Sequence, residues 1–62
     1  MNSDEKLVMM ANQIARNLKD AAATAEHVRA FWTPAMRKAL RDRLASGGEG
    51  LSDIARAAAE AL

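Results

Sequence analysis

The sequence predicts an all-α protein, a small bundle of three to four short helices that forms a single helical domain over residues 1–62. Alanine, leucine, methionine, arginine and lysine are abundant, and all five favour helices. Apolar residues recur at intervals of three and four, which places them on one face of a helix. No part of the sequence alternates apolar and polar residues in the manner of a strand. We expect helices at about 3–19, 21–32, 34–46 and 52–61.

The first expected helix has a capping residue and an apolar stripe. Ser3 can accept hydrogen bonds from the first N–H groups, and the two acidic residues after it complement the positive end of the helix dipole. Val8 and Met9 fall toward the flanks of the stripe. Asp20 is the expected break before the second helix, although one uninterrupted helix through residues 21–23 is an alternative. The stripe itself consists of Leu7, Ala11, Ile14 and Leu18.

Both aromatic residues, Phe31 and Trp32, directly precede Thr33 and the only proline. Proline disfavours the helical conformation in the residue before it, and its missing N–H is no loss in the first turn of a new helix. We therefore expect a corner between two helices, with Thr33 as the cap of the second and Pro34 in its first turn. Phe31 is expected in the core, and Trp32 is expected on the outside of the corner.

The third and fourth expected helices are joined by a glycine-rich loop. Gly47 and Gly48 supply the left-handed or flexible conformation that ends a helix, and Ser52 is the expected cap of the next one. In each helix the larger apolar residues lie four apart. They are Met36, Leu40 and Leu44 in the third helix, and Ile54, Ala58 and Leu62 in the fourth.

Residue types that carry chemistry are scarce. The chain has no cysteine and one histidine, His27, and a zinc site needs three or four ligands. The serines stand where helices begin or end, so capping accounts for them. The segment at 47–50 lacks the lysine of a phosphate-binding loop. We expect no catalytic, cofactor-binding or metal-binding residue in this chain, and no enzymatic activity of the chain alone.

Composition also bears on location. A small chain without cysteine is typical of a reducing compartment. The start, MNSDEK, lacks the basic and apolar regions of a signal peptide, and no apolar run approaches the ~18 residues of a membrane span. A formal net charge of +1 gives no strong attraction to nucleic acid or anionic lipid. We expect a cytoplasmic protein that does not bind membranes.

The apolar residues exceed what one small core can take. Fifteen of the 62 residues are alanine, so the core contains few large side chains and its stability is marginal. Residues 8–10 are three consecutive apolar positions, which one helix face cannot bury together. We expect an apolar surface that another protein covers. The alternatives are a free-standing helical module or homodimer, and a helix-turn-helix nucleic-acid-binding protein that uses Arg37, Lys38, Arg41 and Arg43.

Three blocks in order, KLVMMANQIARNL, HVRAFWTPAMRKAL and GGEGLSDIARAAAEAL, cover nearly the whole chain. Their order and content resemble the delta subunit of soluble NAD-dependent formate dehydrogenases that contain molybdenum or tungsten. The most specific parts are the segments at 10–14 and 31–37.

The resemblance implies a non-catalytic accessory subunit of a complex that oxidises formate and reduces NAD. Its partner is the large catalytic subunit, whose assembly or stability it supports. The resemblance places a molybdenum or tungsten pterin, iron–sulfur clusters, FMN and NAD in the partner subunits. Together with the apolar surplus, it suggests that the chain docks through the corner and the first helix. The partner-binding residues expected there are Met9, Met10, Asn12, Gln13, Phe31, Trp32, Pro34, Met36 and Arg37.

Overall fold

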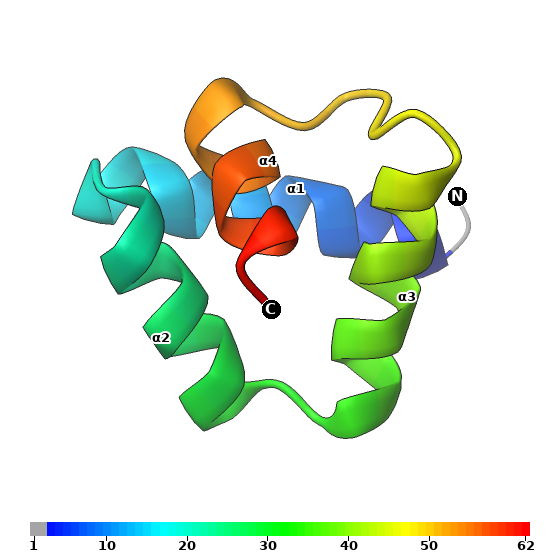
Figure 1. Ribbon diagram of the computed structural model, residues 1–62, viewed down its shortest axis with the longest axis horizontal. Helices are drawn as coiled ribbons and strands as arrows, with labels where there is room; N and C mark the ends of the chain where they lie inside the picture. Colours follow the sequence, from blue (N-terminus) through cyan, green and yellow to red (C-terminus); the bar gives the residue numbers. More distant parts are fainter. Residues whose placement is uncertain (1–2) are drawn as a thin grey trace.

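A computed structural model describes residues 3–62 of the chain, with side chains from Asp4 onward. Within these residues the fold is entirely helical, and the predicted all-α class is confirmed. Figure 1 shows the four helices in chain order. They are α1 (Ser3–Leu18), α2 (Ala21–Phe31), α3 (Pro34–Ala45) and α4 (Asp53–Glu60). The first two helices are separate, which decides the alternative left open by the sequence.

The breaks between helices follow from local side chains. Lys19 has a φ of 57°, and the extended residue after it, Asp20, accepts a hydrogen bond from the Ala23 N–H at 2.8 Å. Ser52 caps α4 in the same way, because its hydroxyl accepts from the Ala55 N–H at 3.3 Å. Both predicted caps are confirmed. The predicted cap at Ser3 concerns a side chain outside the described ones.

The corner between α2 and α3 also has the predicted cap. The Thr33 hydroxyl accepts a hydrogen bond from the Met36 N–H at 3.2 Å, and Pro34 is the first residue of α3. Replacing Thr33 with alanine should lower the free energy of unfolding by about 1 kcal/mol, the usual cost of losing such a cap. Urea denaturation followed by circular dichroism measures this. Thr33→Ser retains the hydroxyl and should stay within about 0.5 kcal/mol of the parent chain, and an equal loss in both variants would contradict the capping role.

The loop after α3 begins with two glycines in left-handed conformations, as the sequence predicts. Gly47 and Gly48 have φ values of 117° and 64°. The Gly48 N–H donates to the Arg43 carbonyl at 2.8 Å, which satisfies an oxygen at the end of α3. A side chain at Gly48 would also place its Cβ 2.9 Å from the Arg56 guanidinium, so the Arg56 side chain would have to move to make room.

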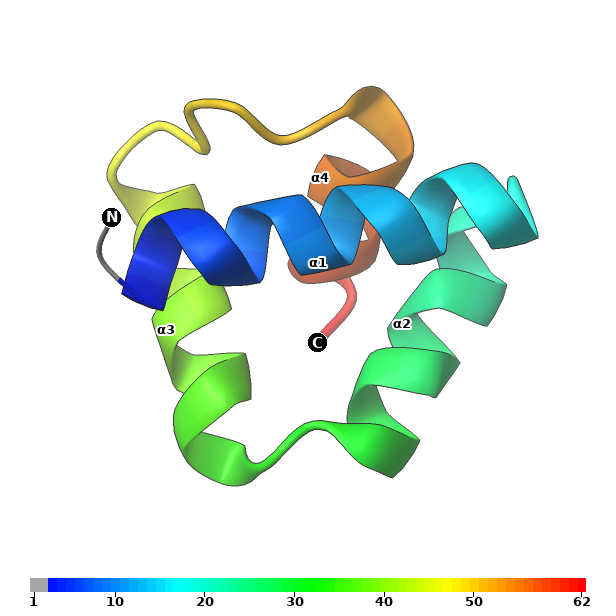
Figure 2. The same ribbon diagram turned by 180° about the vertical axis from the view of Figure 1, so that it is seen from behind.

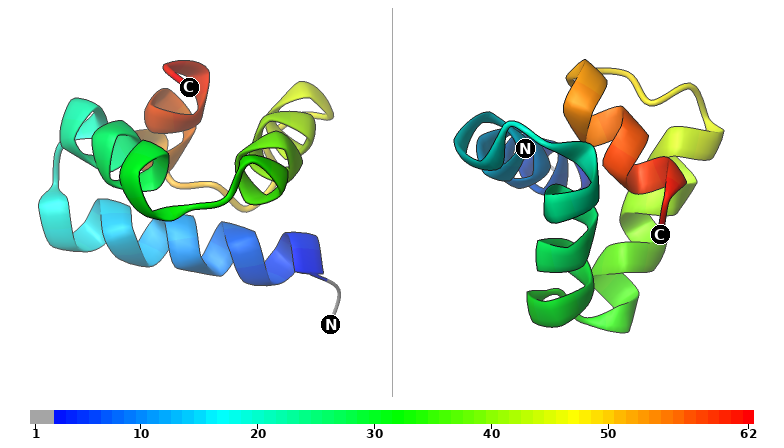
Figure 3. Two further views of the ribbon diagram at one scale, coloured as in Figure 1. Left: turned by 90° about the horizontal axis from the view of Figure 1, so that it is seen from below. Right: turned by 60° about the vertical axis from the view of Figure 1, so that its left-hand side comes forward.

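The helices are arranged in three levels. From the corner at 32–33, which lies at the bottom of Figures 1 and 2, α2 and α3 diverge. Figure 3 shows α1 running along one side of this pair and α4 lying on the other side, between the two arms. Each of the other three helices contacts α4. The short fourth helix therefore lies at the centre of the fold, in contact with the other three.

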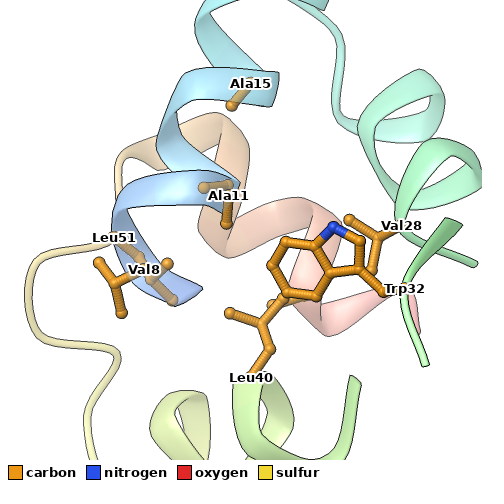
Figure 4. Close-up of a cluster of buried hydrophobic side chains, with 9 residues drawn as sticks. Val8, Ala11, Ala15, Val28, Trp32, Leu40 and Leu51 are labelled. Carbon is orange, nitrogen blue, oxygen red and sulfur yellow. The ribbon is translucent and has the colours of Figure 1, made fainter. Parts of the chain in front are cut away.

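The core gathers where these levels meet, and it contains the tryptophan. Trp32 is 6% exposed, and Figure 4 shows its indole ring beside Val28 and Leu40. Phe31 is 74% exposed. The expected placement of the two aromatic residues was therefore wrong. Trp32 is the C-cap of α2, with extended φ and ψ of −89° and 146°, so its side chain leaves the helical register and turns inward.

The buried face of α1 is rotated slightly from the expected stripe. Ala11 is buried as predicted, but Val8, expected at a flank, is buried too, and Leu18 is 42% exposed. The cause lies in the loop before α4, because Leu51 belongs to the same buried cluster as Val8. Figure 4 shows these two side chains next to each other. A helix pattern alone does not reveal that a loop will cover one flank.

The buried face of α4 consists of alanines. Ala55, Ala58 and Ala59 are each 1–2% exposed, whereas Ile54 and Leu62 are only partly buried against the core. Of the predicted set, Ala58 is thus at the centre and the two larger residues lie at its edges. Small side chains let α4 approach all three neighbouring helices closely, which explains how so short a helix can occupy the middle of the fold.

Candidate partner-binding surface

An apolar groove lies between α1 and α3. It has a volume of about 500 Å³, and each helix contributes one edge with the spacing i, i+1 and i+4. Met10 and Met36, two of the expected partner-binding residues, face each other across it. Both methionines are partly buried, and both also contact the core cluster. The groove lining consists of Lys6, Leu7 and Met10 from α1, and Ala35, Met36 and Ala39 from α3.

Four of these six residues were not expected at a partner surface. Lys6, Leu7, Ala35 and Ala39 occupy the groove because α1 and α3 lie next to each other there. The spacing i, i+1, i+4 can be found twice in the sequence. It predicts a groove only when the two helices are known to be neighbours. Small residues on one wall and methionines on both make a shallow and adaptable apolar surface.

Arg37 serves the corner itself. One nitrogen of its guanidinium, Nη1, donates to the carbonyls of Arg29 and Trp32, each at 3.1 Å. A cation at this position also complements the negative end of the α2 dipole. With Thr33 capping α3 and Pro34 in its first turn, the segment 31–37 builds the corner from its own side chains. Arg37 and Pro34 were expected to contact a partner, and the structure places them in this scaffold.

Asn12 joins the first helix to the loop before α4. Its amide nitrogen donates to the Gly50 carbonyl at 2.8 Å, and its amide oxygen accepts from the Ser52 N–H at 2.9 Å. Both ends of the side chain are therefore used within the protein, across 38 and 40 residues of sequence. The neighbouring Gln13 is exposed and donates weakly to Asn17, at 3.5 Å.

The remaining expected residues divide into buried and exposed ones. Trp32 is inside the core, so its side chain cannot contact a partner in this conformation. Met9 is 60% exposed and points away from the core on α1. Phe31 is exposed at the end of α2, where its ring lies 4.7 Å from that of His27, measured between centroids, with a tilt of 42°. The structure thus brings Met10 and Met36 together, but not Met9 or Phe31 with them in the groove lining.

Several basic side chains of the described residues have partners within the chain. Lys38 pairs with Asp42 at 3.0 Å on an exposed face of α3, and Arg43 donates to the Glu49 carbonyl at 3.2 Å. The guanidinium of Arg56 donates to the carbonyls of Gly47 and Gly48, at 3.1 and 3.3 Å. Of the four basic residues expected to contact nucleic acid, Arg37 and Arg43 donate to backbone carbonyls and Lys38 pairs with Asp42, which weakens that alternative.

Chemistry-bearing groups are not clustered either. Among the described residues, no three His, Cys, Asp or Glu side chains come together in a way that could hold a metal ion. A second hollow, of about 420 Å³, lies between α1 and α4, but the Asn12 and Ser52 side chains at its edge are already hydrogen-bonded within the protein. None of the described helices has the length and apolar character needed to cross a bilayer.

Comparison with known proteins identifies the family. The family model described as NADH-dependent formate dehydrogenase delta subunit FdsD matches residues 6–59. No curated protein and no solved structure matches the chain. The matched region begins in α1 and ends in α4, so it includes all four helices, the groove and the corner. The resemblance seen in the sequence is thereby confirmed, and the chain belongs to the formate dehydrogenase delta subunit family FdsD.

Proposed function

We propose that this chain is a non-catalytic accessory subunit of an NAD-dependent formate dehydrogenase, and that it supports assembly or stability of the large molybdopterin-containing subunit. The family match over residues 6–59 is the observation that carries this proposal. The pterin-bound molybdenum or tungsten, the iron–sulfur clusters, FMN and NAD belong to the partner subunits in this proposal, and the complex is cytoplasmic.

The contacts of the polar side chains support an accessory role. In the most specific parts of the sequence, Asn12, Thr33 and Arg37 make their hydrogen bonds with backbone groups of the same chain, and Gln13 donates weakly to the Asn17 side chain. These side chains position helices and do not converge on one point where a substrate would bind. The groove, by contrast, presents apolar groups, which stabilise a protein contact when another surface covers them.

Omission of the chain tests this function. A formate dehydrogenase produced without it should yield less soluble large subunit and less bound molybdenum or tungsten, because an accessory subunit stabilises the state that it binds. The rate of formate oxidation per bound metal and the KM for formate should be unchanged. Protein yield, metal analysis and steady-state kinetics with NAD measure these quantities.

Two results would count against the proposal. One is a full yield of metal-loaded complex in the absence of the chain. The other is a changed KM for formate in loaded complex that lacks the chain, which would indicate participation in substrate binding. Adding the purified chain back to the deficient complex serves as the control, because restored stability shows that the loss was due to this subunit alone.

A further inference from the structure

We infer that the groove between α1 and α3 binds an amphipathic helix of the large subunit, which inserts two apolar side chains one turn apart and places a carboxylate at Lys6. This inference rests on the proposed function and deepens it, because it names the surface and the kind of segment that it binds. The size of the groove, its lining, its charge and the surfaces available elsewhere on the chain carry it.

The dimensions limit what the groove can hold. Its edges run from Lys6 to Met10 and from Ala35 to Ala39, which is about 6 Å along each helix at 1.5 Å per residue. One turn of a partner helix therefore fits, with two apolar side chains at i and i+3 or i+4. Alanines on the α3 wall permit close approach of a backbone, and the two methionines can adjust to the inserted side chains.

A helix suits these walls better than an extended segment. The groove is lined by helix side chains, and beyond the first turn of α1 and of α3 the backbone N–H and C=O groups next to it are paired within those helices. An extended partner would bury its own unpaired N–H and C=O groups against an apolar surface, which is costly. A helical partner satisfies its backbone internally and presents only side chains, as in other grooves that bind amphipathic helices.

The charge of the groove indicates where an acidic partner residue lies. Lys6 is the one charged residue of the lining. The nearby cations are engaged, because Lys38 pairs with Asp42 and Arg37 donates to the end of α2. No ion pair involves Lys6 among the described residues. A carboxylate on the partner helix would complement this cation at the rim, where such a pair sets orientation and association rate more than affinity.

A second copy of the chain does not supply such a helix. Among the described residues, the exposed large apolar side chains are Met9, Leu18 and Phe31. Met9 and Leu18 lie nine residues apart on α1, and Phe31 is on α2, so no two of them share a face at i and i+3 or i+4. The exposed surface of residues 4–62 lacks the pair of anchors that the groove takes, which favours a different protein as the occupant.

Two alanines provide a matched test. Ala35 and Ala22 are both exposed and are both the second residue of a capped helix, α3 and α2 respectively. A glutamate at either position favours the helix through its dipole, so both variants should fold. In binding to purified formate dehydrogenase complex that lacks this chain, Ala35→Glu should weaken affinity at least about tenfold, because a charge is buried in an apolar contact. Ala22→Glu should change it less than about twofold.

The lysine is tested in the same assay. Lys6→Glu should slow association and weaken affinity by about threefold to tenfold, with a reduced dependence on salt, whereas Lys6→Arg should bind like the parent chain. Thermal unfolding of each free variant verifies that the fold is retained. If the parent chain binds and Ala35→Glu binds equally well, the groove is not the contact and the inference falls, while the proposed function stands. If the parent chain does not bind the deficient complex at all, both fall.

The absence of cysteine permits identification of the occupant. An Ala39→Cys variant carries a single thiol at the groove, to which a photoactivatable cross-linker can be attached. Cross-linking in the whole complex should yield a peptide of the large subunit that is helical, amphipathic and contains Asp or Glu. A cross-link to a second copy of this chain, to a small molecule or to another subunit would overturn the inference.

Discussion

Replacement of Trp32 with alanine is expected to unfold a large part of the protein at 25 °C. A buried tryptophan replaced by alanine costs about 3–5 kcal/mol, because its apolar surface is lost and a cavity remains. A chain of this length has a total stability of only about 3–9 kcal/mol. Trp32 lies in the core with Val28 and Leu40, so the cavity would open between α2 and α3 at the point where they diverge. Urea denaturation followed by far-ultraviolet circular dichroism measures the loss.

The adjacent residue is the control. Phe31→Ala removes a side chain that is 74% exposed, so the free energy of unfolding should fall by less than about 1 kcal/mol, mostly from the ring contact with His27. In this variant Trp32 remains as the only tryptophan, and its fluorescence emission should stay at the short wavelengths of a buried indole. A larger loss of stability in Phe31→Ala than in Trp32→Ala would reverse the assignment of the core residue.

These two residues also show the limit of prediction from the sequence. The corner was predictable, because a cap and a proline act on their immediate neighbours, and Thr33 and Pro34 do what their chemistry requires. Which of the two aromatic side chains turns inward was not predictable from helical spacing. The answer depends on the residue at which α2 ends. Trp32 already has extended backbone angles, so a rule for helical positions does not apply to it.

Asn12→Ala is expected to lower the free energy of unfolding by about 1–3 kcal/mol, since it removes two hydrogen bonds of about 1 kcal/mol each. Asn12 holds the loop before α4 through the Gly50 carbonyl and the Ser52 N–H. Because Ser52 is also the cap of α4, loosening the loop should weaken the start of that helix. Relative to the parent chain, Asn12→Ala should increase the rate of amide hydrogen exchange more in α4 than in α2.

Asn17 provides a matched control on the same helix. Asn17→Ala also gains helix propensity, at most roughly 0.5 kcal/mol this close to the end of α1, and loses only a weak contact with Gln13 at 3.5 Å. Its stability should therefore equal or slightly exceed that of the parent chain. Equal stabilities of the two variants would mean that the hydrogen bonds of Asn12 contribute nothing to the fold.

The candidate surface could be predicted only in part from the sequence, because it depends on contacts between distant parts of the chain. The apolar surplus correctly indicated that the core does not bury every large side chain, and Met9 is one that stays exposed. The role of Asn12 depends on a contact across 38 residues, and the groove depends on how α1 and α3 lie against each other. Both are properties of the assembled fold. Spacing along the chain could therefore not distinguish a residue that holds a loop in place from one that contacts a partner.

The arginines that donate to backbone carbonyls have a consequence for the conditions under which the fold holds. Arg37 reaches two carbonyls and Arg56 reaches two others, from a planar group that a lysine ammonium does not imitate. A chain without cysteine thus holds a corner and a loop in place through contacts that a reductant cannot break.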